Sequence, residues 1–265
     1  MRCNGLVLMA ALLSAGPAAA ADLFAPEPLP PITEPGGFEA RWQFGGAAYV
    51  WAASIEGTTG VGGLPPVDVD ASFSDIVDNL DFAFMGVGEA RYDRYGIFTD
   101  LIYTKLSAGG TGSAGVAKLS VENEMFIATL MGEYRIVEQG NTTVDLMAGG
   151  RLWYVGVDLD VKIASGDYKE GASLSSNETW VDPMIGAKAR LQGASPWYLT
   201  AWGMIGGFGV SSDFTWDVFG GVGYELSDRW SLIAGYRGLG VDYESGDFKF
   251  DIVQHGPIFG GVFRY

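Results

Sequence analysis

The last ten residues, Gly256–Tyr265, read GPIFGGVFRY. Aromatic side chains stand at Phe259, Phe263 and Tyr265, so the alternation reaches the final residue of the sequence. Residues two apart in a β-strand project from the same face of the sheet. A water-soluble sheet would bury this face in a core, whereas a strand in contact with lipid would leave it outside. We therefore expect a strand here whose environment must be judged from the rest of the sequence.

The same period of two recurs along the chain. Segments with this pattern are longer than the five or six residues usual in globular proteins, and about 9–11 tilted residues cross a bilayer. Tight turns alternate with long connections, as in outer-membrane barrels. We predict an all-β fold, a single antiparallel up-and-down barrel of ten strands, or of eight because the connection GVSSD (209–213) is short. The ten segments are 38–54, 80–93, 96–107, 116–136, 142–160, 170–192, 197–210, 213–227, 229–243 and 248–265.

In each segment alternate residues form two rows, one on each face of the strand. One row is apolar and the other, of opposite parity, carries the charges. The apolar rows, such as Phe82 and Phe84 in the second segment, are interrupted by Gly and Ala and carry aromatic residues near their ends, as expected of a lipid-facing surface. A soluble sandwich would show the same alternation, but the opposite parity here balances seven acids with seven bases, which suits a closed interior where unpaired ions are costly. We predict a charge-paired lumen built from Glu39, Arg41, Glu89, Arg91, Asp100, Glu133, Arg135, Asp145, Arg151, Asp182, Lys188, Arg190, Glu225 and Arg237.

The N-terminal residues predict export. A short basic start precedes the apolar run Leu6–Gly16, and small residues follow at Ala18 and Ala20. This pattern indicates a signal peptide over residues 1–21 that is removed from the mature chain. Residues 22–37 contain five prolines and are expected to form an extended periplasmic segment, because proline cannot donate to a β-ladder. The barrel is then expected over residues 38–265.

Composition excludes several classes of function. The chain has 32 Asp and Glu against 16 Lys and Arg, which argues against a nucleic-acid partner. Its single cysteine, Cys3, lies in the predicted signal peptide, so no disulfide or cysteine metal site is expected in the mature protein. After the signal peptide the sequence contains no run of 18 apolar residues, which leaves strands as the membrane-crossing elements. We expect no cofactor.

One short helix is predicted in the first long connection, Ser72–Leu80. Ser72 or Ser74 can cap its first turn, where Asp75 is also favourable. The helix could cover the mouth of the barrel or fold into the lumen. Its apolar stripe would consist of Phe73, Ile76, Val77 and Leu80.

The C-terminal pattern resembles the signature of outer-membrane β-barrel proteins, in which a terminal aromatic residue and another two positions earlier are recognised by the barrel-assembly machinery. Gly260, Phe263 and Tyr265 match it, while Ile258 departs from its usual polar position. Over the mature region the chain resembles the opacity-type surface antigens, akin to the membrane domain of the outer-membrane protein A family. The resemblance implies the outer membrane of a Gram-negative-type bacterium, with lipid and lipopolysaccharide around the barrel.

Few residues could carry chemistry. His255 is the only histidine. Lipid A deacylases use a His–Ser catalytic pair, but no serine directly precedes His255 in this sequence. An amphipathic side chain at the membrane interface is therefore the favoured interpretation. Acidic groups such as Asp68, Asp70, Asp75 and Asp78 are expected to be solvated loop residues, because no complete calcium-loop sequence is present. No metal site is predicted; divalent ions that bridge to lipopolysaccharide phosphates are a weaker hypothesis.

These observations favour a non-enzymatic surface barrel that contributes to envelope integrity or presents loops outside. Barrels of about eight strands are filled by side chains, and open channels appear at about sixteen. A narrow channel for small solutes is the alternative, and a lipid-modifying enzyme is less favoured because no nucleophile–base pair is evident.

Overall fold

The computed structural model describes residues 42–61, 65–111, 117–165, 168–193 and 195–265. The predicted signal peptide (1–21), the Pro-rich segment (22–37) and two of the predicted lumen charges, Glu39 and Arg41, lie outside the described residues. Within the described part, no helix is both long enough and apolar enough to span a membrane.

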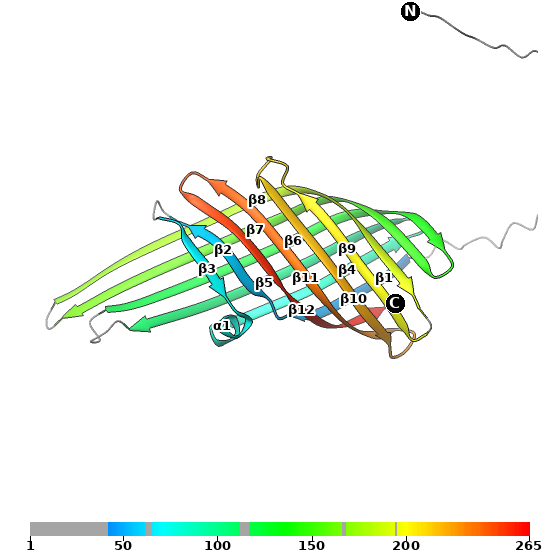
Figure 1. Ribbon diagram of the computed structural model, residues 1–265, viewed down its shortest axis with the longest axis horizontal. Coiled ribbons are helices and arrows are strands. Elements are labelled where there is room, and N and C mark those ends of the chain that lie inside the picture. Colours follow the sequence, from blue (N-terminus) through cyan, green and yellow to red (C-terminus); the bar gives the residue numbers. More distant parts are fainter. Residues whose placement is uncertain (1–41, 62–64, 112–116, 166–167, 194) are drawn as a thin grey trace, which may run out of the picture. The chain divides into compact units, whose positions relative to one another are not determined.

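Ten antiparallel strands close into a barrel (Figure 1), which confirms the predicted fold and the strand count. In spatial order each strand pairs with the next along the chain, so the topology is up-and-down. The strands are β1 (Trp42–Trp51), β4 (Leu80–Tyr92), β5 (Tyr95–Thr111), β6 (Ala117–Gln139), β7 (Thr142–Ser165), β8 (Tyr168–Gln192), β9 (Trp197–Gly206), β10 (Phe214–Glu225), β11 (Trp230–Ser245) and β12 (Phe248–Arg264).

The first and last strands join to close the barrel. β1 pairs with β12 from Gly45–Arg264 to Trp51–Ile258, and Phe44 and Tyr265 exchange both backbone hydrogen bonds at 3.1 and 2.8 Å. Further along β12, a separate strand β2 (Ser54–Gly60) takes the place of β1 and forms a hairpin with β3 (Val67–Ala71). The predicted first segment, 38–54, is therefore interrupted after Trp51.

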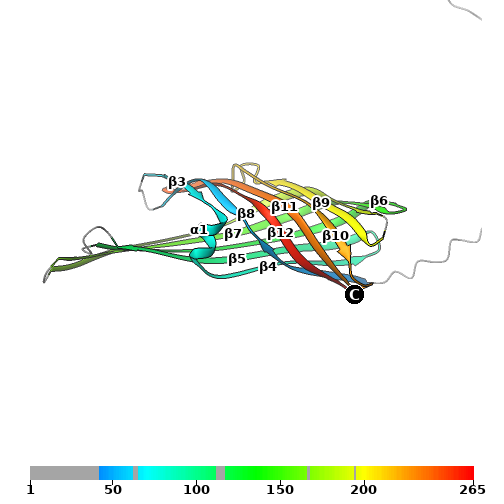
Figure 2. The ribbon, with the colours of Figure 1, turned by 60° about the horizontal axis from the view of Figure 1, so that its bottom comes forward.

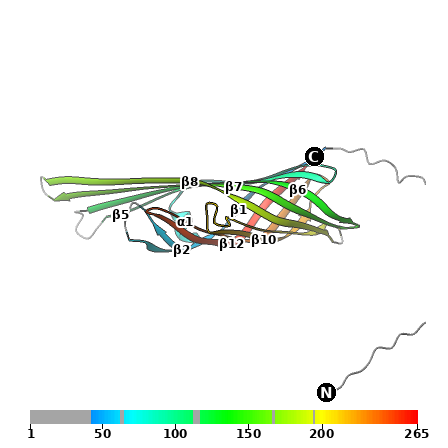
Figure 3. The ribbon, with the colours of Figure 1, turned by 90° about the horizontal axis from the view of Figure 1, so that it is seen from above.

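The strands are longest on one side of the barrel. β6, β7 and β8 contain 23, 24 and 25 residues, whereas β9 contains 10 and pairs with β8 only from Met184 to Gln192. A sheet of β5–β8 consequently projects beyond the rest of the barrel at the end opposite the C-terminus (Figures 1 and 3). Much of what the sequence indicated as a long connection between residues 160 and 170 is strand, because the β7–β8 ladder continues to Ser165–Tyr168.

Apolar side chains cover the exterior. Phe82 and Phe84 are 57% and 52% exposed, and an apolar surface of this extent belongs in lipid. A ring of aromatic residues surrounds the end with the short turns, where Trp42 lies 5.3 Å from Tyr92 between ring centroids. The other pairs of the ring are Tyr95–Tyr134, Trp197–Tyr224 and Trp230–Phe263.

The projecting sheet carries polar groups on its outer face. Lys105 lies 3.3 Å from a carboxylate oxygen of Glu122, and the Tyr103 hydroxyl donates to Glu124 at 2.9 Å. These side chains share the outward parity of the lipid-facing residues nearer the short turns. The change from apolar to charged residues along the same face marks where the strands leave the hydrocarbon.

The predicted helix is present as α1 (Phe73–Asp78), next to the β2–β3 hairpin (Figures 1 and 2). Ser72 caps it: its hydroxyl accepts from the Asp75 backbone N–H, and the Asp75 carboxylate accepts from the Ser72 N–H at 3.0 Å. None of the helical residues is buried, so α1 does not fill the lumen. Leu80, predicted as the end of its apolar stripe, instead begins β4.

The cap makes α1 sensitive to pH. Hydrogen bonds from the Ser72 side chain and backbone lower the pKa of Asp75 from its ordinary value. The ionised Asp75 carboxylate therefore stabilises the helix at every pH above the pKa of an aspartate in an unfolded chain, about 3.9. This stabilisation is lost as the pH falls through the lower pKa of Asp75 in the folded protein. We expect the helical Cα chemical shifts of residues 73–78 to collapse in that acidic range and to weaken at pH 7 in Asp75→Asn. Asp78→Asn is the control and should retain them; shifts unchanged by acid would contradict the prediction.

Candidate functional site in the barrel lumen

The middle of the lumen holds a buried ion-pair network across the barrel. Asp217 of β10 accepts from Arg237 of β11 and Arg151 of β7, each at 2.6 Å. Arg237 also contacts Asp100 of β5 at 2.5 Å, and the Tyr49 hydroxyl of β1 donates to the same carboxylate at 2.7 Å. Strands that are not neighbours in the sheet are thereby tied together through the interior.

Asp217 is absent from the predicted set although it completes this network. Its side chain is 0% exposed, and the Trp202 indole donates to its second oxygen at 3.0 Å. Asp217 has the same parity as Glu225 in β10, which was predicted to face inward. Strict application of that parity along the strand would have found it.

A second charged group, the wall cluster, lies nearer the short turns. Arg91 reaches Glu133 at 2.6 Å and Asp145 at 2.9 Å, and Lys188 lies 2.6 Å from both Glu89 and Glu133. The cluster contains three acids and three bases, namely Glu89, Glu133, Asp145, Arg91, Arg135 and Lys188.

The three carboxylates of the wall cluster lie close enough together to ligate a cation. The positive charge they require is already supplied by Arg91 and Lys188, whose nitrogens occupy the space around them. The cluster is therefore a network of internal ion pairs built from the chain itself.

A third group lines the mouth at the short-turn end. Arg190 of β8 and Arg264 of β12 share one oxygen of Glu225, at 3.1 and 3.2 Å. Both guanidinium groups also lie over the ring of Tyr198, 3.5 and 5.1 Å from its centroid. Arg264 was not among the predicted residues, yet it stands between Phe263 and Tyr265 of the opening stretch and so has the inward parity.

Asp182 lies inside the barrel but does not join the predicted charge pairs. Its carboxylate accepts from the backbone N–H of Ser212 at 2.8 Å, the Ser212 hydroxyl at 2.7 Å and the Trp180 indole at 3.2 Å. Among the described residues no Lys or Arg forms an ion pair with it. The role of Asp182 is to hold the β9–β10 connection against β8, which is a correction to the prediction.

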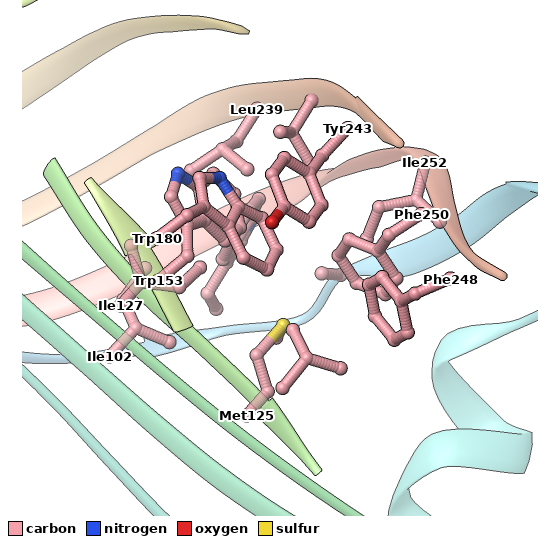
Figure 4. Close-up of a cluster of buried hydrophobic side chains, with 14 of the residues drawn as sticks. Ile102, Met125, Ile127, Trp153, Trp180, Leu239, Tyr243, Phe248, Phe250 and Ile252 are labelled. Atoms are coloured by element: carbon pink, nitrogen blue, oxygen red, sulfur yellow. The ribbon is translucent and has the colours of Figure 1, made fainter. Parts of the chain in front are cut away.

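Apolar side chains fill the half of the lumen toward the projecting sheet (Figure 4). Trp180 stacks on Tyr243 with centroids 3.9 Å apart and on Trp153 at 5.6 Å, and Phe248 and Phe250 pack beside them. We call this group the aromatic plug. It corrects the expectation that inward positions are mainly charged: Trp153 and Trp180 share their parity with Arg151 and Asp182, and the interior changes from polar to apolar along single strands.

The lumen therefore has three levels between the two ends: a charged mouth with the wall cluster, a central ion-pair network and the aromatic plug. A hollow of about 490 Å³ remains on the mouth side, bordered by residues such as Gly45, Arg190 and Trp202. We call this hollow the vestibule. The plug and the network lie at its inner end.

His255 lies on the outer face of the barrel. Its Nδ1 is 2.7 Å from the Tyr236 hydroxyl and its Nε2 is 3.5 Å from a carboxylate oxygen of Glu56. Both ring nitrogens have partners, and among the described residues neither forms a hydrogen bond with a serine hydroxyl, although Ser54 stands opposite His255 in the β2–β12 ladder. The geometry suits an amphipathic interfacial residue more than a general base.

A closed antiparallel barrel with a filled interior and an apolar, aromatic-rimmed exterior defines a membrane β-barrel of the outer-membrane type. No protein-family model matches the sequence, and no curated protein matches it. The outer membrane protease OmpT from Escherichia coli shares the fold, with a TM-score of 0.53, 10% identity and coverage of 88% of this chain and 99% of that chain.

Other solved outer-membrane structures align with lower similarity. The translocator domain of autotransporter NalP from Neisseria meningitidis has a TM-score of 0.44 and 13% identity over 87% of this chain and 90% of that chain. The attachment invasion locus protein Ail of Yersinia pestis has a TM-score of 0.30 and 13% identity over 86% of this chain and all of that chain. At these identities the likeness concerns fold and carries no activity to this chain.

The central network should contribute strongly to stability. Arg237→Met removes the cation between two buried carboxylates, and breaking a buried pair in this way costs about 3–5 kcal/mol. Arg229→Met, at an exposed turn, is the control and should change stability by less than about 0.5 kcal/mol. Urea unfolding of the detergent-solubilised barrel, followed by tryptophan fluorescence, measures both. Equal effects of the two substitutions would show that the network contributes nothing.

The mouth depends on a glycine. A Cβ at Gly223 would overlap the ring of Tyr198, on which Arg190 and Arg264 lie, whereas a Cβ at Gly220 of the same strand meets nothing within 4 Å. Overpacking of this kind costs about 1–3 kcal/mol. We expect Gly223→Ala to destabilise the barrel by that amount in the same unfolding assay and Gly220→Ala to behave like wild type. Wild-type stability of Gly223→Ala would contradict this account of the mouth.

Proposed function

We propose that the protein is a non-enzymatic integral protein of a Gram-negative-type outer membrane, with a lumen that does not conduct solutes and a surface role centred on its projecting sheet. The aromatic plug is the observation that carries the proposal. Trp153, Trp180 and Tyr243 are 0%, 5% and 7% exposed and belong to one apolar cluster with buried residues of β1, β5, β6, β10 and β12. Water and ions would have to displace a packed apolar core to pass.

The exterior supports residence in an outer membrane. Short turns face the periplasm in bacterial barrels, so the aromatic ring and Tyr265 would lie at the periplasmic interface and the projecting sheet outside the cell. Lipopolysaccharide would then surround the outer part of the wall. Divalent ions would link its phosphates to acids on the outer face of this region, of which the exposed Glu122 is an example.

Assembly is proposed to use the C-terminal strand. Gly260, Phe263 and Tyr265 lie in or directly after β12, which forms the seam with β1. Binding of β12 by the barrel-assembly machinery would keep the unpaired edge of this strand covered until β1 can pair with it. This order would prevent an unpaired edge from meeting lipid.

The absence of an enzymatic role is proposed from the chemistry of the described residues. Apart from Asp182, the interior carboxylates described above are bound by Arg and Lys partners, and His255 is held by Tyr236 and Glu56 on the outer surface. The described serine that contacts an interior carboxylate, Ser212, donates to Asp182 as part of the link between β8 and the β9–β10 connection, and His255 hydrogen-bonds Tyr236 rather than a serine. Surface presentation is favoured because β5–β8 extend well beyond the lipid-facing residues and carry polar side chains there.

Planar-bilayer recording tests the closed lumen. Wild-type protein should insert without discrete conductance steps, because the plug excludes water. The variant Trp153→Ala/Trp180→Ala/Tyr243→Ala removes the stacked rings and should give small reproducible openings or brief flickering. An exterior triple variant, Leu130→Ala/Val181→Ala/Leu232→Ala, is the control and should stay silent. Regular openings of the wild-type barrel would refute the proposal and favour a narrow channel.

A further inference from the structure

The vestibule exists because one wall of the barrel has small residues at inward positions. On β1 these positions are Gly45 and Ala47, and the nearest atom to a Cβ placed on Gly45 would be the Phe263 carbonyl oxygen at 3.8 Å. The hollow of about 490 Å³ lies within the 300–1,000 Å³ typical of small-molecule sites. Its opening is at the short turns, since Arg264 and Tyr265 border it.

The inner part of the vestibule is aromatic. Trp202 and Phe219 pack with centroids 4.3 Å apart, and the edge of Phe98 meets Trp202 at 5.7 Å. The Trp202 indole N–H is engaged by Asp217, so the ring offers only its apolar surface to the hollow. Ile233 and Ile258 continue this surface toward β11 and β12. A planar or branched apolar group would find complementary contacts there.

The mouth of the vestibule carries an excess of positive charge. The wall cluster matches three bases with three acids, whereas Arg190 and Arg264 at the mouth share the single carboxylate of Glu225. The two guanidinium groups are held on one face of the barrel by Tyr198, with side chains still 28% and 36% exposed. Two guanidinium groups that share one carboxylate repel each other, and an anion between them would relieve the repulsion.

We propose that the vestibule is a binding site, open to the periplasmic side, for a small amphipathic organic anion. An aromatic or branched apolar body lies against Trp202 and Phe219, and one carboxylate, sulfonate or phosphate group lies between Arg190 and Arg264. The two parts of the site are set at different depths, so the ligand must be apolar at one end and anionic at the other. This inference goes beyond a surface role, because it assigns the lumen a ligand of its own.

Equilibrium dialysis against nanodisc-embedded protein tests the site, with naphthalene-2-sulfonate as probe, naphthalene-2-methanol as its uncharged counterpart and empty nanodiscs as background. Wild type should bind about one sulfonate per barrel, saturably, and the alcohol at least tenfold more weakly. Equal affinity for both probes would overturn the role of the mouth. No saturable excess over empty nanodiscs would overturn the site.

Substitutions on the two faces of β1 locate the bound probe. Gly45→Leu places a side chain in the vestibule and should weaken sulfonate binding at least tenfold. Ala48→Leu adds a side chain to the lipid-facing row of the same strand, at a residue that does not border the vestibule, and should leave binding unchanged. If Gly45→Leu lacks the gel-mobility shift of a folded barrel on heating, Ala47→Leu replaces it. If the folded Gly45→Leu or Ala47→Leu variant binds the sulfonate as well as wild type does, the proposed location of the site is wrong.

Charge changes at the mouth test the anion contact. Arg264→Gln leaves Arg190 and Glu225 as a neutral pair and should weaken sulfonate binding several-fold, whereas Glu225→Gln removes the competing carboxylate and should strengthen it. Neither change should alter binding of the alcohol. Parallel effects on both probes would mean that the substitutions act through the shape of the barrel, and the proposed anion contact would be wrong.

Discussion

The pairing of every backbone N–H and C=O within hydrocarbon is the constraint on which the structure depends. A sheet in lipid cannot keep a free edge, because each unpaired group there costs several kcal/mol. The seam between β1 and β12, continued by β2, meets this requirement, and Tyr265 completes it by exchanging backbone hydrogen bonds with Phe44. Closure then creates an interior that side chains must fill, and the distribution of those side chains decides what the barrel can do.

The interior is filled in two chemically different ways. Around Arg237, charges neutralise one another across the barrel, which fixes the relative position of strands that are not neighbours. Around Trp180, aromatic rings stack on one another and are buried. Near β1, where inward positions are Gly45 and Ala47, a hollow remains. The described residues thus form a packed interior with a chamber at its mouth.

The fold could be predicted because the period of two is a local property of each strand, and the rows around Phe84 and Phe259 face outward as expected. The contents of the lumen were less accessible. Parity places Arg151 and Trp153 on the same side, but which residues meet them depends on the tilt and stagger of distant strands. Hence Asp217 and Arg264 were missed, and Asp182 was assigned to a network it does not join.

The unequal heights of the strands set how deeply the barrel can sit in its bilayer. The pairing of β8 with β9 ends at Met184, so the part of β8 between Tyr168 and Pro183 forms a ladder with β7 only. Its other side makes single hydrogen bonds to the β9–β10 connection at Val181 and Pro183. Such a border tolerates water but not acyl chains. On this flank the boundary between hydrocarbon and water should lie near Val181, the last large apolar residue of β8 that faces outward. The polar projecting sheet beyond it limits how deeply this side of the barrel can enter the membrane.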